Sequence, residues 1–148
     1  MKTYVVAFAI ALFTSWILTP YVKNLAFKIG AVDKPDPRKV HKGIMPRLGG
    51  LAIFVGFLIA VLSTVTMSRD LFGILTGAFV ILIVGILDDV YQLPAKVKLL
   101  GQIVAAAVLI FFGIQIEWLN NPFGGYFYLD YLFIPITIFW VVRFTNVV

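Results

Sequence analysis

The sequence predicts an all-α, polytopic membrane protein with about five transmembrane helices and a short external β-hairpin. Of the 148 residues, 61% are hydrophobic and 13% are charged, and the mean hydropathy is +1.02. An ordinary soluble domain has about 25% charged residues, and a globule this small could not bury so much apolar surface. The apolar residues also gather into five runs that lack the alternation of outer-membrane strands, and the absence of cysteine excludes a disulfide scaffold.

Each apolar run is about 17 to 20 residues long, enough for a helix to cross a hydrocarbon core about 30 Å thick. All five belong to one membrane domain over residues 1–148, and the predicted spans are 4–21, 48–67, 71–87, 99–116 and 131–148. Pro20 is expected to end the first span. No small-x-small cleavage site closely follows this run, so it is expected to remain as an uncleaved span.

The basic residues predict an orientation in the membrane. Nine of the twelve lysines and arginines lie in the segments 22–47 and 88–98. The positive-inside rule places both segments in the cytoplasm and the N-terminus outside, with Arg143 near the cytoplasmic end of the last span. The basic residues behind the net charge of +5 are therefore expected to form a cytoplasmic rim. It suits an anionic membrane surface or a phosphorylated substrate, and nucleic acid is not expected as a partner.

The segment 117–130, on the opposite side, predicts a hairpin at the membrane interface. Its centre, residues 120–125, is Asn-Asn-Pro-Phe-Gly-Gly, a run dense in turn-forming residues. Trp118, Tyr126 and Tyr128 flank this turn, and their rings suit the level of the lipid headgroups. The simplest role for the segment is an anchored surface loop.

Asp88 and Asp89 form the first candidate site, because they follow seventeen residues without a charge. They lie at the C-terminal end of a predicted helix, where the macrodipole is already negative. Mg²⁺ would relieve this repulsion, since it takes one or two carboxylates together with waters and substrate phosphate oxygens. In the alternative interpretation the pair marks the water boundary of the span, with Lys96 and Lys98 as compensating charges.

A basic, proline-rich loop between the first two spans forms the second candidate site. In this loop Lys42 and Gly43 precede Gly49 and Gly50, where the next span begins. A lysine beside glycine-rich backbone near a helix N-terminus is suited to receiving phosphate. The alternative is a loop that only sets topology and contacts lipid headgroups, with His41 solvated. The residues thus predict a site with carboxylates and cations at the cytoplasmic face, compatible with metal-assisted phosphate chemistry, without defining the reaction.

Both segments resemble one known family. Residues 32–50 are similar to the first cytoplasmic loop of the polyprenyl-phosphate N-acetylhexosamine-1-phosphate transferases, and residues 85–102 resemble their Asp-Asp signature and the loop after it. Residues 93–98, Leu-Pro-Ala-Lys-Val-Lys, are closer to the undecaprenyl-phosphate N-acetylglucosaminyl-1-phosphate transferase branch. The resemblance covers the whole chain but only the N-terminal part of such an enzyme, so we expect the chain to be a partial enzyme.

The resemblance implies transfer of N-acetylhexosamine 1-phosphate, with N-acetylglucosamine as the sugar in this branch. The donor is a UDP-N-acetylhexosamine, the acceptor is undecaprenyl phosphate and UMP is released, either directly or through a covalent enzyme intermediate. This is the first membrane step of cell-envelope polysaccharide synthesis, at the cytoplasmic face of the bacterial plasma membrane. The implied cofactor is Mg²⁺, with Mn²⁺ as the alternative ion. The lipid bilayer is a partner, and homodimer formation stays open.

The resemblance also assigns roles to individual residues. Asp88 and Asp89 are implied to be catalytic and to serve the metal ion. The implied substrate-binding residues are Lys42, Lys98, His41, Arg38, Arg47 and Asn146. Two other classes of function stay open: a non-catalytic membrane module that binds lipid phosphate or assembles with a partner, and a transporter fragment. An ion path would need acids near the middle of the membrane, whereas this pair lies at the end of a span.

Overall fold

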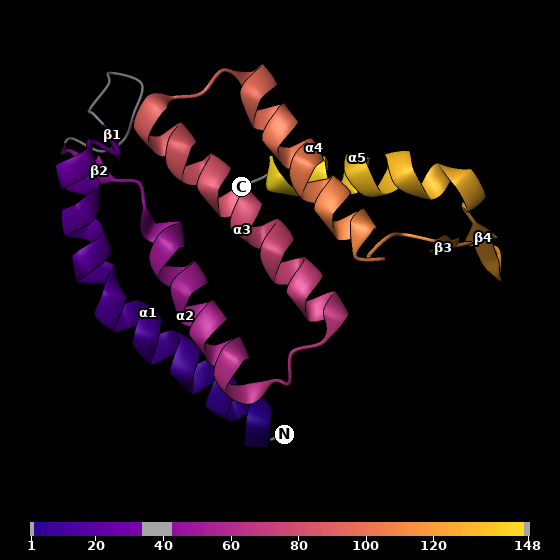
Figure 1. Cartoon of the computed structure of the whole chain (residues 1–148), viewed down its shortest axis with the longest axis horizontal. Helices are drawn as coiled ribbons and strands as arrows, with labels where there is room; N and C mark the ends of the chain where they lie inside the picture. Colours follow the sequence, from indigo (N-terminus) through magenta and orange to yellow (C-terminus); the bar gives the residue numbers. More distant parts are fainter. Residues whose placement is uncertain (1, 34–42, 147–148) are drawn as a thin grey trace. The chain divides into compact units, whose positions relative to one another are not determined.

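The computed structural model describes residues 2–33 and 43–146. Five helices occur in this part of the chain (Figure 1): α1 (Lys2–Ile29), α2 (Gly49–Thr64), α3 (Arg69–Tyr91), α4 (Ala95–Phe111) and α5 (Phe133–Thr145). The short elements are β1 (Val32–Asp33), β2 (Met45–Pro46), β3 (Trp118–Asn120), β4 (Tyr126–Tyr128) and the 3₁₀ turn η1 (Asp130–Leu132). The chain forms two compact units, residues 1–67 with 85–93 (unit 1) and residues 68–84 with 94–148 (unit 2), so that α3 contributes to both.

A helix occurs at each of the five predicted spans, but the boundaries differ. The expectation that Pro20 ends the first span is wrong, because α1 continues through it to Ile29. Proline removes one backbone donor, and apolar helices tolerate this when nearby groups compensate. Part of the predicted basic loop, including Lys23 and Lys28, is therefore helical.

Two helices in the described part of the chain, α1 and α3, are long and apolar enough to cross a membrane. Helix α2 is apolar but has 16 residues, and α4 and α5 have 17 and 13. At about 1.5 Å per residue, a helix needs about 20 residues to cross a hydrocarbon core. The presence of five helices agrees with the sequence analysis, whereas the number of membrane spans stays a prediction.

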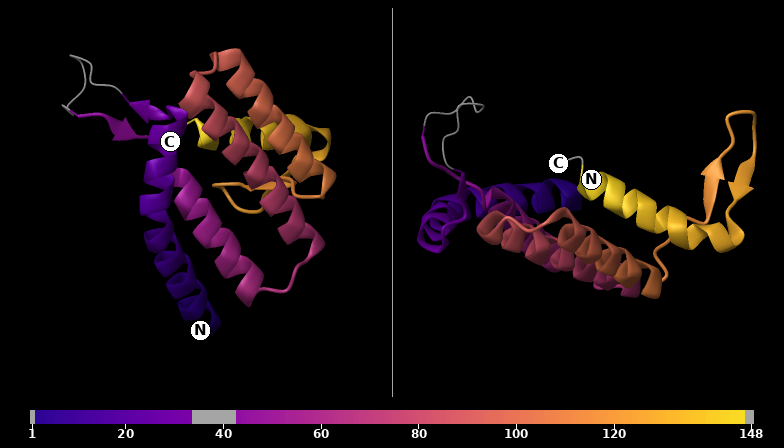
Figure 2. Two further views of the ribbon diagram at one scale, coloured as in Figure 1. Left: turned by 60° about the vertical axis from the view of Figure 1, so that its left-hand side comes forward. Right: turned by 90° about the horizontal axis from the view of Figure 1, so that it is seen from above.

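In unit 1, α1 and α2 run side by side (Figures 1 and 2). The buried residues of α2 are Ala52, Gly56 and Ala60, one small residue every four positions. This spacing places them in one row, where small side chains allow two helix backbones to approach closely. A Cβ added at Gly56 would lie 2.7 Å from the carbonyl oxygen of Ala11. The contact between the helices therefore depends on this row.

A second contact region of unit 1 lies where α1 ends. Strands β1 and β2 pair antiparallel, with Val32 opposite Pro46 and Asp33 opposite Met45. The buried residues Ala26, Ala31 and Leu48 form a cluster, and Val22, Ile86 and Val90 pack against it. This cluster positions the C-terminal end of α3. The sequence analysis did not predict this ladder, because two residues per strand are too few to show an alternating pattern.

In unit 2, the first part of α3 packs against α4. A Cβ at Gly73 would lie 2.5 Å from Cβ of Phe112, and a Cβ at Gly101 would lie 2.4 Å from a methyl group of Val84. Helix α5 contacts α4 and crosses it (Figures 1 and 2). Thr137 of α5 is buried, and its hydroxyl oxygen accepts the backbone N–H of Ile116 at 3.0 Å. Glycines thus allow close contact between the first part of α3 and α4.

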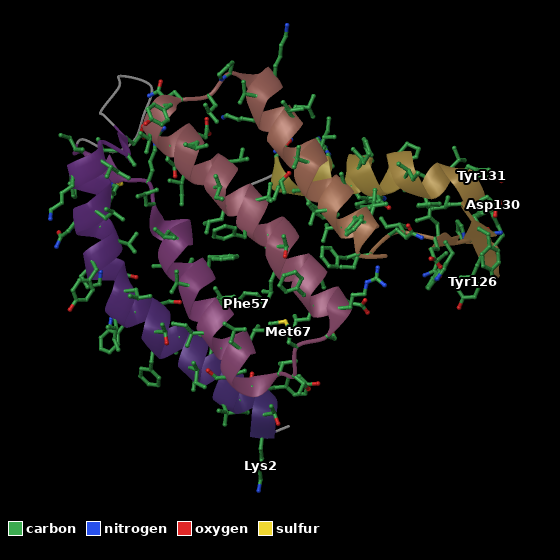
Figure 3. All side chains as sticks on the ribbon, viewed as in Figure 1. Lys2, Phe57, Met67, Tyr126, Asp130 and Tyr131 are labelled. Carbon is green, nitrogen blue, oxygen red and sulfur yellow. The ribbon has the colours of Figure 1, made fainter. Side chains whose placement is uncertain are left out.

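The predicted hairpin at 117–130 is confirmed. Strands β3 and β4 pair antiparallel with Trp118 opposite Tyr128, and Trp118 stacks edge-on with Tyr126 at a centroid distance of 4.7 Å. Tyr126, Asp130 and Tyr131 lie together at this end of unit 2 (Figure 3). Gly124 (φ +107°) and Gly125 (φ +82°) close the turn in backbone conformations that glycine adopts readily. Local turn chemistry therefore decides this element.

Candidate active site

Asp88 and Asp89 lie in the last turn of α3, as the sequence predicts, and both are half-buried. Successive residues of an α-helix point about 100° apart. Ile86 and Val90 pack against the Ala26 cluster, and Asp89 follows Ile86 by three positions on this side of the helix. Asp88 therefore starts from a different side of α3. The two side chains therefore leave the helix in different directions.

Helix α3 ends at Tyr91, two residues after this pair. The N–H of Gln92 bonds to the carbonyl of Asp88 at 2.8 Å, and Gln92 has a φ of +51°. A left-handed residue that bonds back in this way is a common helix end, usually with glycine in this position. Pro94 then prevents the helix from continuing. Both carboxylates are thus held at the negative end of the helix dipole, which favours a cation there.

We expect Gln92→Gly to raise the stability of the protein, because glycine adopts a positive φ without the steric cost of a Cβ. The gain is about 0.5–1 kcal/mol, since the greater freedom of glycine in the unfolded chain offsets part of it. Gly113→Ala is the matched variant at the end of α4, where φ is +86°. It should lower stability by about 1 kcal/mol. Thermal unfolding in one detergent measures both, and changes of the same sign would contradict the expectation.

Arg47, a predicted substrate-binding residue, forms an ion pair with Asp33. Both side chains are half-buried, and the backbone N–H of Arg47 also bonds to the carbonyl of Ala31 at 3.0 Å. These two contacts connect Arg47, which follows β2, to Asp33 of β1 and to Ala31 just before β1. Arg47 therefore links the chain just before the basic loop to the chain just after it. The sequence analysis did not select Asp33, although the opposite charges of Asp33 and Arg47 were its visible signal.

A double-mutant cycle tests whether Arg47 and Asp33 stabilise each other. Arg47→Met and Asp33→Asn should each destabilise the protein, with a coupling of about 0.5–1 kcal/mol because partly exposed ion pairs contribute little more. The exchanged pair, Asp33→Arg with Arg47→Asp, should be more stable than either reversal alone. Chemical unfolding measures the four states of the cycle. Strictly additive effects would contradict a structural role for the pair.

Lys98 and Asn146, two further predicted site residues, both belong to unit 2. Lys98 lies in the first turn of α4, and Gln102 follows one turn later on the same side of the helix. Gln102 is only 7% exposed, and its Oε1 accepts a hydrogen bond from Nδ2 of Asn146 at 2.9 Å. Asn146 directly follows α5. The fold thus joins the end of α5 to the side of α4 that carries Lys98.

Three predicted site residues, Arg38, His41 and Lys42, lie outside the described residues. Gln102, in contrast, was not predicted as a site residue. It is the only polar residue between Leu99 and Phe111. An amide in an otherwise apolar helix needs a polar partner, and this was the signal for its role.

The Asp88–Asp89 pair fits a hard divalent cation by the chemistry of its donors. Both side chains offer only oxygen atoms as ligands. Among the described residues no group of three or more His, Cys, Asp or Glu side chains could hold a metal ion, so a metal here would have at most two protein carboxylates. Mg²⁺ commonly binds one or two protein carboxylates and completes its shell with water and phosphate oxygens. Such an ion suits an open site that also receives phosphate.

Comparisons with known proteins identify the family to which the chain is similar. A family model described as glycosyl transferase family 4 matches residues 71–148. The probable undecaprenyl-phosphate N-acetylglucosaminyl 1-phosphate transferase of Bacillus subtilis is 46% identical over 150 residues, which cover 100% of this chain and 42% of the relative. The decaprenyl-phosphate N-acetylglucosaminephosphotransferase of Mycobacterium tuberculosis is 38% identical over 75% of this chain and 30% of its own length.

A third relative is the undecaprenyl-phosphate alpha-N-acetylglucosaminyl 1-phosphate transferase of Yersinia pestis. It is 34% identical over 69% of this chain and 28% of its own length. The chain thus spans less than half the length of these curated relatives. No solved structure shows significant similarity to the chain.

Proposed function

The chain belongs to glycosyl transferase family 4, and from this membership we propose that the whole protein transfers N-acetylglucosamine 1-phosphate from its UDP-activated form to undecaprenyl phosphate. The observation that carries the proposal is the 46% identity to the Bacillus subtilis relative across the entire chain. In the reaction an oxygen of the lipid phosphate becomes bonded to the β-phosphorus. The bond between that phosphorus and the bridging oxygen breaks, and UMP leaves with the electron pair.

The main physical obstacle to this reaction is charge repulsion, because both reactants carry phosphate. Two unit charges 4 Å apart repel by about 4 kcal/mol at an effective dielectric of about 20. Positioned positive charge therefore supplies most of the catalysis in phosphoryl transfer. The basic residues of segments 22–47 and 88–98 suit this role, since nine of the chain's twelve lysines and arginines lie there.

The proposal gives the site residues distinct roles. Asp88 or Asp89 accepts the proton of the lipid phosphate and so strengthens it as a nucleophile. Lys42 and Lys98 bind phosphate oxygens as point charges. Arg38 and His41 are further contacts for the anionic substrates, and Asn146 contacts the nucleotide sugar. Arg47 is paired with Asp33, and only a guanidinium N–H outside that pair is proposed to reach the substrates.

The same acidic pair is proposed to serve the metal ion as well as the lipid phosphate. Because their side chains leave α3 about 100° apart, one carboxylate is assigned to the ion and the other to the proton. A bound Mg²⁺, or Mn²⁺, would neutralise phosphate charge in the transition state.

The proposed location follows from the same chemistry. The prenyl chain stays in the lipid while its phosphate meets a water-soluble nucleotide sugar at the cytoplasmic face. Helix α3 fits this arrangement, because it is a membrane-length helix whose last turn carries the two carboxylates. The positive-inside rule places this end in the cytoplasm. A transporter would need such acids in the middle of the span.

The test is an assay of the whole protein in lipid nanodiscs with UDP-[¹⁴C]GlcNAc, undecaprenyl phosphate and Mg²⁺. The expected result is equal amounts of UMP and of a labelled lipid that mild acid hydrolyses to sugar phosphate. UDP-GalNAc in place of UDP-GlcNAc tests the sugar. Saturable binding of undecaprenyl phosphate without UMP would instead support a non-catalytic lipid-phosphate-binding module and contradict the proposal.

A further inference from the structure

The Asn146 side-chain amide has a single possible orientation in the described structure. Its Nδ2 lies 2.8 Å from the carbonyl oxygen of Val142 and 2.9 Å from Oε1 of Gln102. A backbone carbonyl can only accept a hydrogen bond, so the nitrogen of the amide must face Val142. The same nitrogen faces Gln102, which must therefore present its oxygen.

This arrangement uses both N–H donors of Asn146. An asparagine amide has two N–H groups and one carbonyl oxygen. With both donors bound inside the protein, the side chain offers only Oδ1 to a ligand. Asn146 is exposed, and within the described part of the chain its Oδ1 accepts no hydrogen bond.

Gln102 holds the second N–H of Asn146 from another helix, whereas the Val142 carbonyl holds the first from the same helix. Gln102 lies 44 positions away in the sequence and is 7% exposed, within an apolar stretch of α4. The other buried residues of α4 are Ala105 and Ala106, and neither has a polar side chain that could compete for the Gln102 amide. A buried amide without a partner would be costly, so the bond to Asn146 stabilises both side chains.

We propose that Gln102 is a positioning residue that holds the Asn146 amide with its oxygen toward the ligand. The inference rests on the proposed function, in which Asn146 contacts the substrate. Asn146 then binds a hydrogen-bond donor or a cation through its oxygen, and not a phosphate oxygen. Such a group is a hydroxyl or N–H of the nucleotide sugar, or a divalent cation held with it. Phosphate recognition is then left to the lysines.

The test is a double-mutant cycle in the whole protein, with UMP release as the readout. Gln102→Met keeps the size of the side chain but removes the acceptor, and it should lower kcat/KM by about tenfold. The same substitution in an Asn146→Ala background should have no further effect, because Gln102 acts through Asn146. Gln102→Glu retains an acceptor of equal length and should restore activity to within about threefold of the wild type.

Gln115→Met is the matched control, because the Gln115 side chain bonds at 3.1 Å to Glu117 in an exposed position of the same unit. Its activity should equal that of the wild type. Two titrations identify the ligand: a raised KM for UDP-GlcNAc in Gln102→Met indicates a donor of the nucleotide sugar, and a raised half-saturating Mg²⁺ concentration indicates the cation. Multiplicative losses in the double mutant, or a Glu variant as weak as the Met variant, would overturn the inference.

A second measurement separates this inference from the proposed function. In the whole protein labelled with ¹⁵N-asparagine, the Asn146 side-chain protons should exchange slowly with water, and Gln102→Met should expose them. The Asn146→Ala variant assigns the signal. If the wild type releases no UMP, the proposed function fails while slow exchange still supports the geometry. Fast exchange in the wild type would overturn the positioning role whatever the activity.

Discussion

Replacing Asp88 or Asp89 with Asn in the whole protein is expected to lower the rate of UMP release by about 10²–10⁴-fold. This is the range in which a positioned acid or base contributes to catalysis. The two variants should also differ in kind. Loss of the carboxylate that holds the ion raises the Mg²⁺ concentration for half-maximal rate, whereas loss of the proton acceptor lowers kcat at saturating Mg²⁺.

The same variants should be no less stable than the wild type, and this separates a catalytic loss from a folding defect. Both carboxylates lie in the last turn of α3, where a negative charge opposes the helix dipole. Removing either charge should therefore raise stability by about 0.3–1 kcal/mol. Thermal unfolding without Mg²⁺ measures this change.

Asp70→Asn is the matched control on the same helix. Asp70 is exposed in the first turn of α3, where a negative charge is favourable. This variant should keep full activity and lose about 0.3–1 kcal/mol of stability. The Asp88 and Asp89 variants, at the other end of α3, should instead lose activity and gain stability. Retained turnover in the Asp88→Asn, Asp89→Asn double mutant would contradict the proposed active site.

The second large effect is expected from Gly56→Ala, which should destabilise unit 1 by about 1–3 kcal/mol. The new methyl group would lie 2.2 Å from Oγ of Ser15 and 2.7 Å from the carbonyl oxygen of Ala11. The Ser15 hydroxyl can rotate, but the backbone carbonyl cannot move without shifting α1 away from α2. Gly56→Leu should be more harmful, because it requires a wider separation of the two helices.

Gly50→Ala, in the first turn of α2, is the control for Gly56→Ala. Nothing lies within 4 Å of a Cβ at Gly50, so its stability should be unchanged or slightly higher. Ser15→Ala combined with Gly56→Ala should recover only part of the loss, since the Ala11 contact remains. Thermal unfolding of the four proteins in one detergent measures these differences. Equal stability of the Gly50 and Gly56 variants would show that close helix contact is not needed.

Local features of the sequence were sufficient to predict most of the elements. Hydropathy located the five helices, because an apolar run of helical length has few other stable states. The Asn-Asn-Pro-Phe-Gly-Gly run located the β3–β4 hairpin, because its two glycines adopt positive φ angles without a Cβ. The position of Asp88 and Asp89 in the last turn of α3 also followed from the charge-free run before them.

Other features required the tertiary structure, because they depend on contacts between residues far apart in the chain. Helix α1 continues beyond Pro20, and residues near its end pack with Leu48. Arg47 meets Asp33 across a ladder too short to show a pattern. The bond between Gln102 and Asn146 spans 44 positions.

The sequence by itself thus determined the family to which the chain belongs and the positions of the helices, because composition and local motifs act within one segment. Only the tertiary structure decided which small residues bring the helices together. It also decided that the second N–H of the Asn146 amide is held by Gln102, because another helix supplies that partner.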